Sequence, residues 1–247
     1  MYKTKDNPLH EIVLISLILG ASLGGLVFLV TFSLWNAWGM AYIALEVYGM
    51  FLSIHFLCEF INTYLYQESK VTSRSFLIYG NKGNFEFWIM QLLALWEYLA
   101  MRSHLVGRYL PQGAETMRNN RLVQYGGVFM ILVGLFVRTL AMKTCGDSFS
   151  HYIATENNQH KLVTNGVYSV LRHPSYFGFW FFAIGVQLLL ENWGNLLLNF
   201  IVLTKFLKVR IEFEEWFLVH RIFGDEYVEY KNRVGVWIPF LRIKRNI

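Results

Sequence analysis

The chain has 247 residues, of which 55% are hydrophobic and 16% are charged. This composition excludes a disordered chain, and the two cysteines, Cys58 and Cys145, exclude a disulfide framework and a four-cysteine zinc site. The formal net charge is +5, and this positive charge accompanies long apolar runs. We therefore predict an all-α, polytopic integral membrane protein with cytosolic basic loops and no nucleic-acid partner.

The first apolar segment runs from residue 12 to residue 35 without a charged residue. At about 1.5 Å per residue, it is long enough to cross the roughly 30 Å hydrocarbon core of a bilayer. Gly20 and Gly24 have the GxxxG spacing that lets a second helix approach closely. This spacing permits self-association into a homo-oligomer without requiring it.

The second apolar segment covers about residues 41–58. It follows the first after a very short connection, so the two segments should form a tight antiparallel pair. Glu46, His55 and Glu59 lie within or near it. Ionisable groups at membrane depth are expensive and often functional, but we favour contacts with neighbouring helices or with the membrane interface for these three.

Two further apolar segments cover about residues 85–100 and 122–142. The segment 85–100 is the least certain crossing, because counting it places the four arginines of residues 102–121 in the lumen, against the positive-inside rule. The sequence leaves open whether residues 85–100 fully span and on which side residues 102–121 lie. The segment 122–142 contains one charged residue, Arg138.

Two shorter apolar segments follow, and a polar turn at residues 191–195 separates them. We predict a helical hairpin over residues 176–209. The charged and aromatic tail from Lys205 should be helical at least to Tyr230 and should lie in the cytosol. With the four segments before it, this arrangement gives about six membrane-embedded helices.

Several motifs of soluble enzymes are absent from the sequence. No GxGxxG follows a predicted strand, and there is no Walker A motif, no GxSxG elbow and no HExxH. The seven histidines are scattered without paired ligand spacing, so we expect no metal site.

The polar residues that most need an explanation flank the predicted hairpin. Arg172 and His173 immediately precede Pro174, which suits the first turn of a helix because its missing N–H costs nothing there. Across the hairpin, Arg210 and Glu214 are four residues apart and share a helix face. A cation, an anion and an imidazole should therefore converge at the membrane–cytosol boundary. Interfacial anchoring and an ordinary surface ion pair are the plainer interpretations.

These residues belong to an ordered set that resembles the isoprenylcysteine carboxyl methyltransferases, in their fungal form. The set comprises residues 162–168 and 172–178, the pair Glu214-Glu215, Phe223-Gly224, and Tyr227 with Tyr230. Residues 7–11 and 148–151 are similar to the fungal branch as well. The RHPxYxG pattern alone is shared with other membrane methyltransferases and with sterol-reductase-like proteins, whereas the full set is more specific.

The resemblance implies a multi-pass enzyme of the endoplasmic reticulum membrane whose active site faces the cytosol. Such an enzyme uses S-adenosylmethionine to methylate the C-terminal carboxylate of farnesyl or geranylgeranyl cysteine in prenylated, CaaX-processed proteins. Residues 1–142 would then supply the N-terminal membrane helices, and residues 143–247 would supply the cofactor-binding and catalytic region. The preference between the two prenyl groups stays open.

The resemblance also implies roles for individual residues. Arg210 would bind the substrate carboxylate. Arg138 is a second candidate for catalysis, with an ion pair inside the helix bundle as the equal alternative. The cofactor would contact His160, Lys161, Leu162, Val163, Tyr168, His173, Pro174, Ser175, Tyr176 and Glu214. Whether Glu214 or Glu215 makes the last contact stays open, and His151 is a further candidate for the pocket.

An isoprenoid would have to enter such a site laterally from the lipid. The aromatic side chains Phe177, Phe179, Trp180, Phe181 and Phe182 could form one side of that path. For most of them, contact with lipid at the membrane interface is the plainer interpretation.

Three other functions compete with this one. A phosphatidylethanolamine-type methyltransferase would act on an amine, which a nearby arginine would repel, so the Arg210 and Arg138 pair favours a carboxylate substrate. A sterol-reductase-like NADPH enzyme would need basic groups for the 2′-phosphate and usually more spans. A membrane scaffold without enzymatic activity would leave the ordered set unexplained.

Overall fold

The computed structural model describes residues 9–36, 42–81, 83–103, 120–151 and 161–243, and within them the regular structure is helical. The main helices are α1 (Leu9–Trp35), α2 (Ile43–Tyr66), α3 (Asn84–Arg102), α5 (Arg121–Cys145), α6 (Pro174–Leu190), α7 (Trp193–Phe217) and α8 (Asp225–Arg233). Short 3₁₀ turns and one π-helical turn connect some of them. The all-α prediction is confirmed for these residues.

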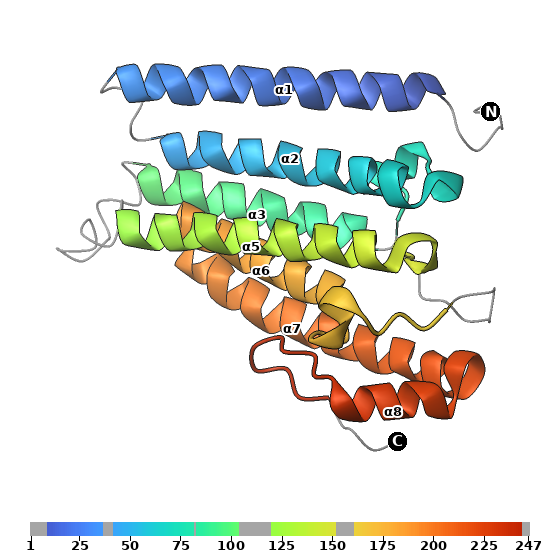
Figure 1. Ribbon diagram of the computed structural model, residues 1–247. Helices are drawn as coiled ribbons and strands as arrows, with labels where there is room; N and C mark the ends of the chain where they lie inside the picture. Colours follow the sequence, from blue (N-terminus) through green and yellow to red (C-terminus); the bar gives the residue numbers. More distant parts are fainter. Residues whose placement is uncertain (1–8, 37–41, 82, 104–119, 152–160, 244–247) are drawn as a thin grey trace.

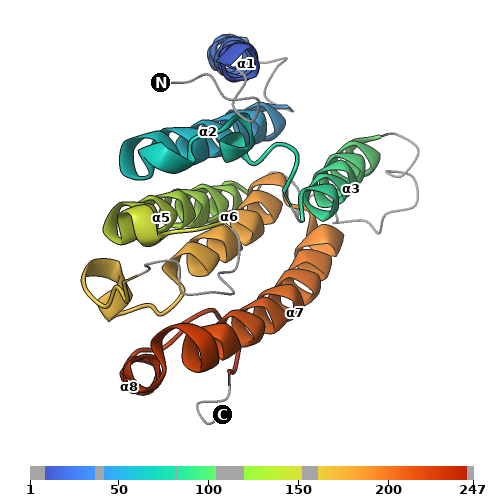
Figure 2. The same ribbon diagram turned by 90° about the vertical axis from the view of Figure 1, so that its right-hand side faces the viewer.

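The long helices lie roughly side by side, with α1 on one outer side and α8 on the other (Figure 1). Turned by 90°, the molecule shows α7 running alongside α6 on the side away from α5, with α3 beside the end of α7 that begins at Trp193 (Figure 2). Three of the described helical segments are long and apolar enough to cross a membrane: Leu9–Trp35, Ile43–Tyr66 and Arg121–Ser148. The segment predicted as the least certain crossing, now α3, is not among them.

Helix α2 extends beyond the predicted apolar segment to Tyr66. Its added turns carry Glu59, Asn62 and Thr63, which are all buried. Asn62 donates to the hydroxyl of Thr139 on α5 at 3.0 Å. The helix therefore continues through polar residues because neighbouring helices supply hydrogen-bond partners for them. The length of the apolar run alone could not predict this extension.

Helices α5 and α6 are in backbone contact. A Cβ atom added to Gly134 would lie 2.5 Å from the carbonyl oxygen of Gly178, and one added to Gly127 would lie 2.7 Å from that of Gly185. At these distances only glycine fits, because any Cβ atom would overlap the facing backbone. Small residues in general let membrane helices pack closely. The contact fixes the start of α6 against Arg138 on α5.

The connection between α6 and α7 is shorter than predicted. Helix α6 ends at Leu190, Glu191 takes a left-handed conformation with φ 55°, and α7 begins at Trp193. The carboxylate of Glu97 on α3 accepts the backbone N–H groups of Gly194 and Asn195 at 2.8 and 2.7 Å. A cap supplied by another helix thus starts α7 earlier than the local sequence suggests.

The prediction of a continuous helical tail is wrong at one place. Helix α7 passes into a π-helical turn over Leu218–Phe223. The helix is then interrupted at Gly224, which has a φ of 58°, and α8 begins at the next residue. Glycine adopts this positive φ without the strain that a side chain would bring. The break turns Tyr227 and Tyr230 back toward the start of α6.

Candidate functional site

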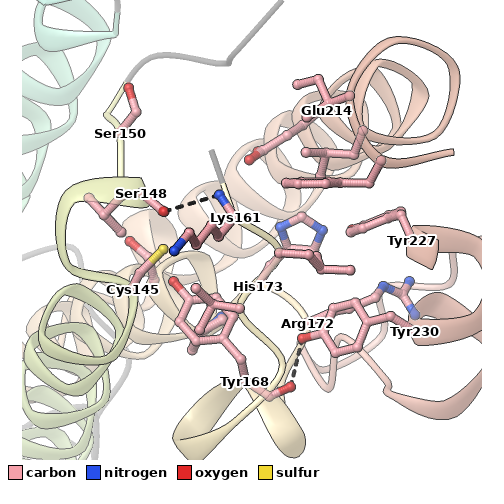
Figure 3. A pocket seen from close by; sticks show the side chains of 18 of the residues that line it. Cys145, Ser148, Ser150, Lys161, Tyr168, Arg172, His173, Glu214, Tyr227 and Tyr230 are labelled. Carbon is pink, nitrogen blue, oxygen red and sulfur yellow. Dashed lines mark hydrogen bonds between the residues drawn. The ribbon is translucent and has the colours of Figure 1, made fainter. Parts of the chain in front are cut away.

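A polar cavity lies where the ends of α5, α6, α7 and α8 meet (Figure 3). Residues between α5 and α6 complete its wall. Of the residues predicted to contact a cofactor, it is lined by Lys161, Leu162, Val163, Tyr168, His173, Pro174, Ser175, Tyr176 and Glu214. His160 lies outside the described residues. The predicted cofactor residues come from distant parts of the sequence, and the fold gathers nine of them around this one cavity. We call it the polar cavity.

The predicted start of α6 is confirmed, because Pro174 occupies its first turn and His173 is its N-cap residue. The ring of His173 stacks on that of Tyr176 at 5.5 Å between centroids. Both side chains line the polar cavity.

The tyrosine hydroxyl of Tyr176 joins the two residues predicted to share a face of α7. It donates to Oε2 of Glu214 at 2.6 Å and accepts from Nε of Arg210 at 2.9 Å. Nη2 of Arg210 donates to the backbone carbonyl of His151 at 2.8 Å. These two bonds use two of the five guanidinium donors, so the arginine is oriented and keeps donors for a ligand.

Glu215 has a different environment from its neighbour Glu214. It is fully buried and accepts from Nε of Arg172 at 2.8 Å, and Nε2 of His173 lies 3.1 Å from the same oxygen. Nζ of Lys231 lies 3.0 Å from its other oxygen. The predicted convergence of cation, anion and imidazole therefore occurs, but Glu215 is the anion. Glu214 is the glutamate that lines the polar cavity.

Three tyrosines close the polar cavity. The hydroxyl of Tyr230 donates to the backbone carbonyl of Tyr168 at 2.6 Å. Burial raises the pKa of Tyr168, Tyr227 and Tyr230, so their hydroxyl groups stay protonated. Among the described residues, the buried hydroxyl of Tyr227 has no hydrogen-bond partner. A polar ligand in the cavity could satisfy it.

The polar cavity also contains residues that the sequence did not assign to it. Cys145, Leu218, Ile222 and Phe223 are among its lining residues. The last three come from the π-helical turn and its junction with α7. No local sequence pattern predicts a π-helical turn, so these lining residues could not be found from the sequence. Tyr227 and Tyr230, by contrast, were identified because their spacing places them on one helix face.

A second cavity adjoins the first and shares Phe149, Ser150, Ser175 and Tyr176 with it. We call it the junction cavity. Its other lining residues include His55, Arg138, His151 and Arg210. Burial lowers the pKa of His151 to about 4, so its imidazole is neutral at physiological pH. His151 thus lies in the predicted region, beside Arg210.

Arg138 lies in the junction cavity and is held by an ion pair inside the bundle. Its guanidinium contacts both carboxylate oxygens of Glu59 on α2. Its Nη1 donates to Oγ of Ser175 at 2.7 Å, at the start of α6. Of the two interpretations left open by the sequence, this geometry supports the ion pair. It also supports neighbouring-helix contacts for Glu59.

A third cavity, which is mostly apolar, lies between α3, α6 and α7 and shares Gly83, Phe87, Phe179 and Phe206 with the junction cavity. We call it the apolar cavity. Phe179 and Phe182 line it. The other three residues of the predicted aromatic wall, Phe177, Trp180 and Phe181, belong to the hydrophobic cluster that packs α6 against α7.

No group of three or more histidine, cysteine, aspartate or glutamate side chains in the described part of the chain could hold a metal ion. The arrangement instead offers charged and hydroxyl groups beside an apolar path.

Comparison with known proteins agrees with this geometry. Protein-S-isoprenylcysteine O-methyltransferase of Saccharomyces cerevisiae is 39% identical over 244 residues, which cover 96% of this chain and 94% of the yeast protein. The chain belongs to the isoprenylcysteine carboxyl methyltransferase family. The family's sequence model matches residues 127–220, which include Arg138, Arg210 and Glu214.

Further members of the isoprenylcysteine carboxyl methyltransferase family agree in length and fold. The enzyme of the same name from Schizosaccharomyces pombe is 33% identical, over 94% of this chain and 97% of its own. A solved structure of a eukaryotic intramembrane Ras methyltransferase of this family superposes with a TM-score of 0.71 at 26% identity, covering 81% of this chain and 68% of that one. The resemblance first seen in the motifs is therefore confirmed along nearly the whole chain.

Proposed function

We propose that this chain is a protein-S-isoprenylcysteine carboxyl O-methyltransferase. It transfers a methyl group from S-adenosylmethionine to the C-terminal carboxylate of prenylated, CaaX-processed proteins that carry farnesyl or geranylgeranyl cysteine. The observation that carries the proposal is the continuity of the cavities: the junction cavity, which Arg210 lines, adjoins the polar cavity on one side and the apolar cavity on the other. A water-soluble methyl donor and a lipid-linked carboxylate need such a meeting point.

The polar cavity fits S-adenosylmethionine by the chemistry of its lining. Glu214 supplies a carboxylate for an ammonium group or ribose hydroxyls, and Tyr227 supplies a buried hydroxyl without a partner among the described residues. Lys161, Leu162 and Val163 line the same space and offer backbone groups. When bound, S-adenosylmethionine supplies a methyl group attached to a positively charged sulfur.

Arg210 is the proposed clamp for the substrate carboxylate. A guanidinium can hold a carboxylate through two parallel hydrogen bonds and so orient one of its oxygens. Because a carboxylate is already a nucleophile, the chain needs no strong general base, and alignment and exclusion of water are its main contributions. The hydrogen bond from Arg210 to Tyr176 fixes the clamp beside the cofactor cavity.

Arg138 acts as a positioning residue in this proposal. Its bonds to Glu59 and Ser175 tie α2, α5 and the start of α6 together. It thereby holds Ser175 and Tyr176 at the boundary between the polar and junction cavities.

The membrane arrangement follows from the same proposal. We place the protein in the endoplasmic reticulum membrane as a multi-pass protein of about six membrane-embedded helices, including the hairpin 176–209, with its active site facing the cytosol. Residues 143–247 form the cofactor-binding region, and residues 1–142 contribute membrane helices. On α1, the Cβ positions of Gly20 and Gly24 meet nothing within 4 Å among the described residues, which leaves room for a second copy.

Transfer of label from methyl-labelled S-adenosylmethionine to N-acetyl-S-farnesylcysteine tests the activity in membranes that contain the protein. We expect a base-labile product, because a methyl ester hydrolyses in base. Base-stable label in phospholipid, with none on the farnesylcysteine, would contradict the proposal and support methylation of an amine instead.

A further inference from the structure

The three cavities follow one another along α6 and α7. The polar cavity has Tyr176 on α6 and Glu214 on α7. One turn deeper along α7 lies Arg210 in the junction cavity, and the apolar cavity continues to Val186 on α6 and Asn199 on α7. From Glu214 to Asn199 the path covers roughly 22 Å at about 1.5 Å per residue. The chemical character of the wall thus changes in a fixed order along the path.

His55 lies at the transition from polar to apolar lining. Its side chain comes from α2 and lines the junction cavity. Its ring stacks on Phe182 at 4.6 Å between centroids, and the rings of Phe87 and Phe179 lie 6.3 and 6.4 Å away. These three phenylalanines also line the apolar cavity.

The imidazole of His55 has an unsatisfied atom. The residue is 3% exposed, and its Nδ1 has no hydrogen-bond partner among the described residues. Glu59, one helical turn further on, gives both carboxylate oxygens to Arg138. Buried polar atoms are nearly always paired, so an orphaned nitrogen in a side chain that lines a cavity points to a ligand.

The substrate of the proposed function has its groups in the same order as the path. The carboxylate would lie at Arg210 and the isoprenoid in the apolar cavity. Between them lie the α-carbon of the cysteine, which bears the peptide amide, and the thioether sulfur. The sulfur is only a weak acceptor, whereas the amide is a strong hydrogen-bonding group.

We infer that His55 recognises the peptide amide of prenylcysteine through Nδ1, and so makes the enzyme select a lipidated amino acid rather than any lipidated carboxylate. This inference rests on the proposed function. His55 is a specificity-determining residue that binds the substrate beside, and not at, the reacting atoms.

Two substrates and two variants test the inference in the membrane-bound full chain. N-acetyl-S-farnesylcysteine carries the amide, and S-farnesyl-3-mercaptopropionic acid keeps the carboxylate, thioether and lipid but lacks it. His55→Phe keeps a ring against Phe182 and removes the nitrogen, whereas the amide of His55→Asn can occupy the position of Nδ1.

We expect the unmodified protein to prefer the substrate with the amide. In His55→Phe, kcat/KM for that substrate should fall by roughly tenfold to a hundredfold, as for loss of one buried hydrogen bond, while that for the other substrate should change little. His55→Asn should keep most of the preference. As a matched control, His220→Phe replaces an exposed histidine that stacks on Trp216 and should leave both rates unchanged.

Equal losses on both substrates in His55→Phe, with binding of labelled S-adenosylmethionine intact, would overturn the inference, and so would a preserved preference. If His55→Phe neither binds labelled S-adenosylmethionine nor methylates either substrate, His55→Asn decides: retained preference supports the inference and lost preference overturns it. A wild-type protein that methylates neither substrate would overturn the proposed function itself.

Discussion

At the scale of single residues, the neighbours Glu214 and Glu215 show how environment separates identical side chains. Glu214 lines the polar cavity and accepts from Tyr176. Glu215 is fully buried in an ion cluster with Arg172 and Lys231. One carboxylate is therefore available to a ligand, and the other compensates two buried cations. The sequence pair alone could not assign these roles, because the two residues are adjacent and lie at the same end of α7.

Substitution of each glutamate should separate ligand binding from stability. Glu214→Ala should weaken S-adenosylmethionine binding by roughly tenfold to a hundredfold, the effect of losing a hydrogen bond to a charged group. Glu215→Gln should instead lower the free energy of unfolding by about 3–5 kcal/mol, because it leaves buried cations uncompensated. Isothermal titration of the cofactor and thermal denaturation in detergent measure the two effects. Unchanged affinity in Glu214→Ala would move the cofactor contact to another residue.

Arg210 should be required for transfer and dispensable for cofactor binding. We expect Arg210→Ala to lower kcat/KM for N-acetyl-S-farnesylcysteine by at least about a hundredfold, since the carboxylate loses its alignment. Binding of labelled S-adenosylmethionine should persist. Lys208→Ala is the control, because Lys208 is an exposed cation on the same helix, 3.9 Å from Glu212, and its loss should not affect turnover. Turnover at the wild-type rate in Arg210→Ala would contradict the proposal that Arg210 holds the substrate carboxylate.

At the scale of helices, the contact between α5 and α6 determines the position of the first turn of α6, which lines the polar cavity. Gly134 and Gly178 bring the two backbones together. That approach places Ser175 within 2.7 Å of Arg138. The glycine of the RHPxYxG pattern thus has a packing reason: a side chain there would push α6 away from the bundle.

Gly178→Ala should therefore destabilise the protein by about 1–3 kcal/mol, as overpacking in a close-packed interior does. Its new Cβ would lie 2.5 Å from the carbonyl oxygen of Gly134. Gly126→Ala on α5 is the matched control, because its Cβ would meet nothing within 4 Å among the described residues. We expect the control to be neutral or slightly stabilising. Equal melting temperatures for the two variants would show that the close contact is unimportant.

At the scale of the whole molecule, the path from polar to apolar cavity needs parts of the chain that are far apart in sequence. The polar cavity is built from residues from Cys145 onward, but His55 of α2 and Phe87 of α3 help to close the path. A C-terminal catalytic region alone would therefore leave the lipid side open. The N-terminal helices contribute to the site as well as to the membrane anchor.

Chain-length selectivity should depend on the depth of the apolar cavity. Ala183 lines this cavity beyond Phe179, so Ala183→Phe should shorten it. We expect transfer to a geranylgeranyl substrate to fall roughly tenfold more than transfer to a farnesyl one, since the longer chain reaches deeper. The ratio of kcat/KM values measures this. Val209→Phe, at a position that is 67% exposed on α7, is the control. An unchanged ratio in Ala183→Phe would place the lipid elsewhere.

The sequence by itself determined the helical class, the bounds of α1 and α5 within a few residues, and the set of motif residues that meet at the polar cavity. It could do so because a lipid-facing helix must be apolar along its length and because Pro174 marks a helix start. The longer α2, the cap of α7 by Glu97 and the break at Gly224 were hidden from it. The first two depend on groups that only folding brings together, and the third depends on a backbone conformation that glycine permits but does not require.

The tertiary structure alone decided which charges face a cavity and which neutralise one another. Arg138 and Glu59 are far apart in sequence, as are Arg172 and Glu215, and no spacing rule links them. Arg210 and Glu214 do share a helix face as predicted, but Tyr176 from α6 lies between their polar atoms. A side chain's residue type fixes what it can bind, whereas the atoms within hydrogen-bond distance, set by helix packing, fix what it does bind.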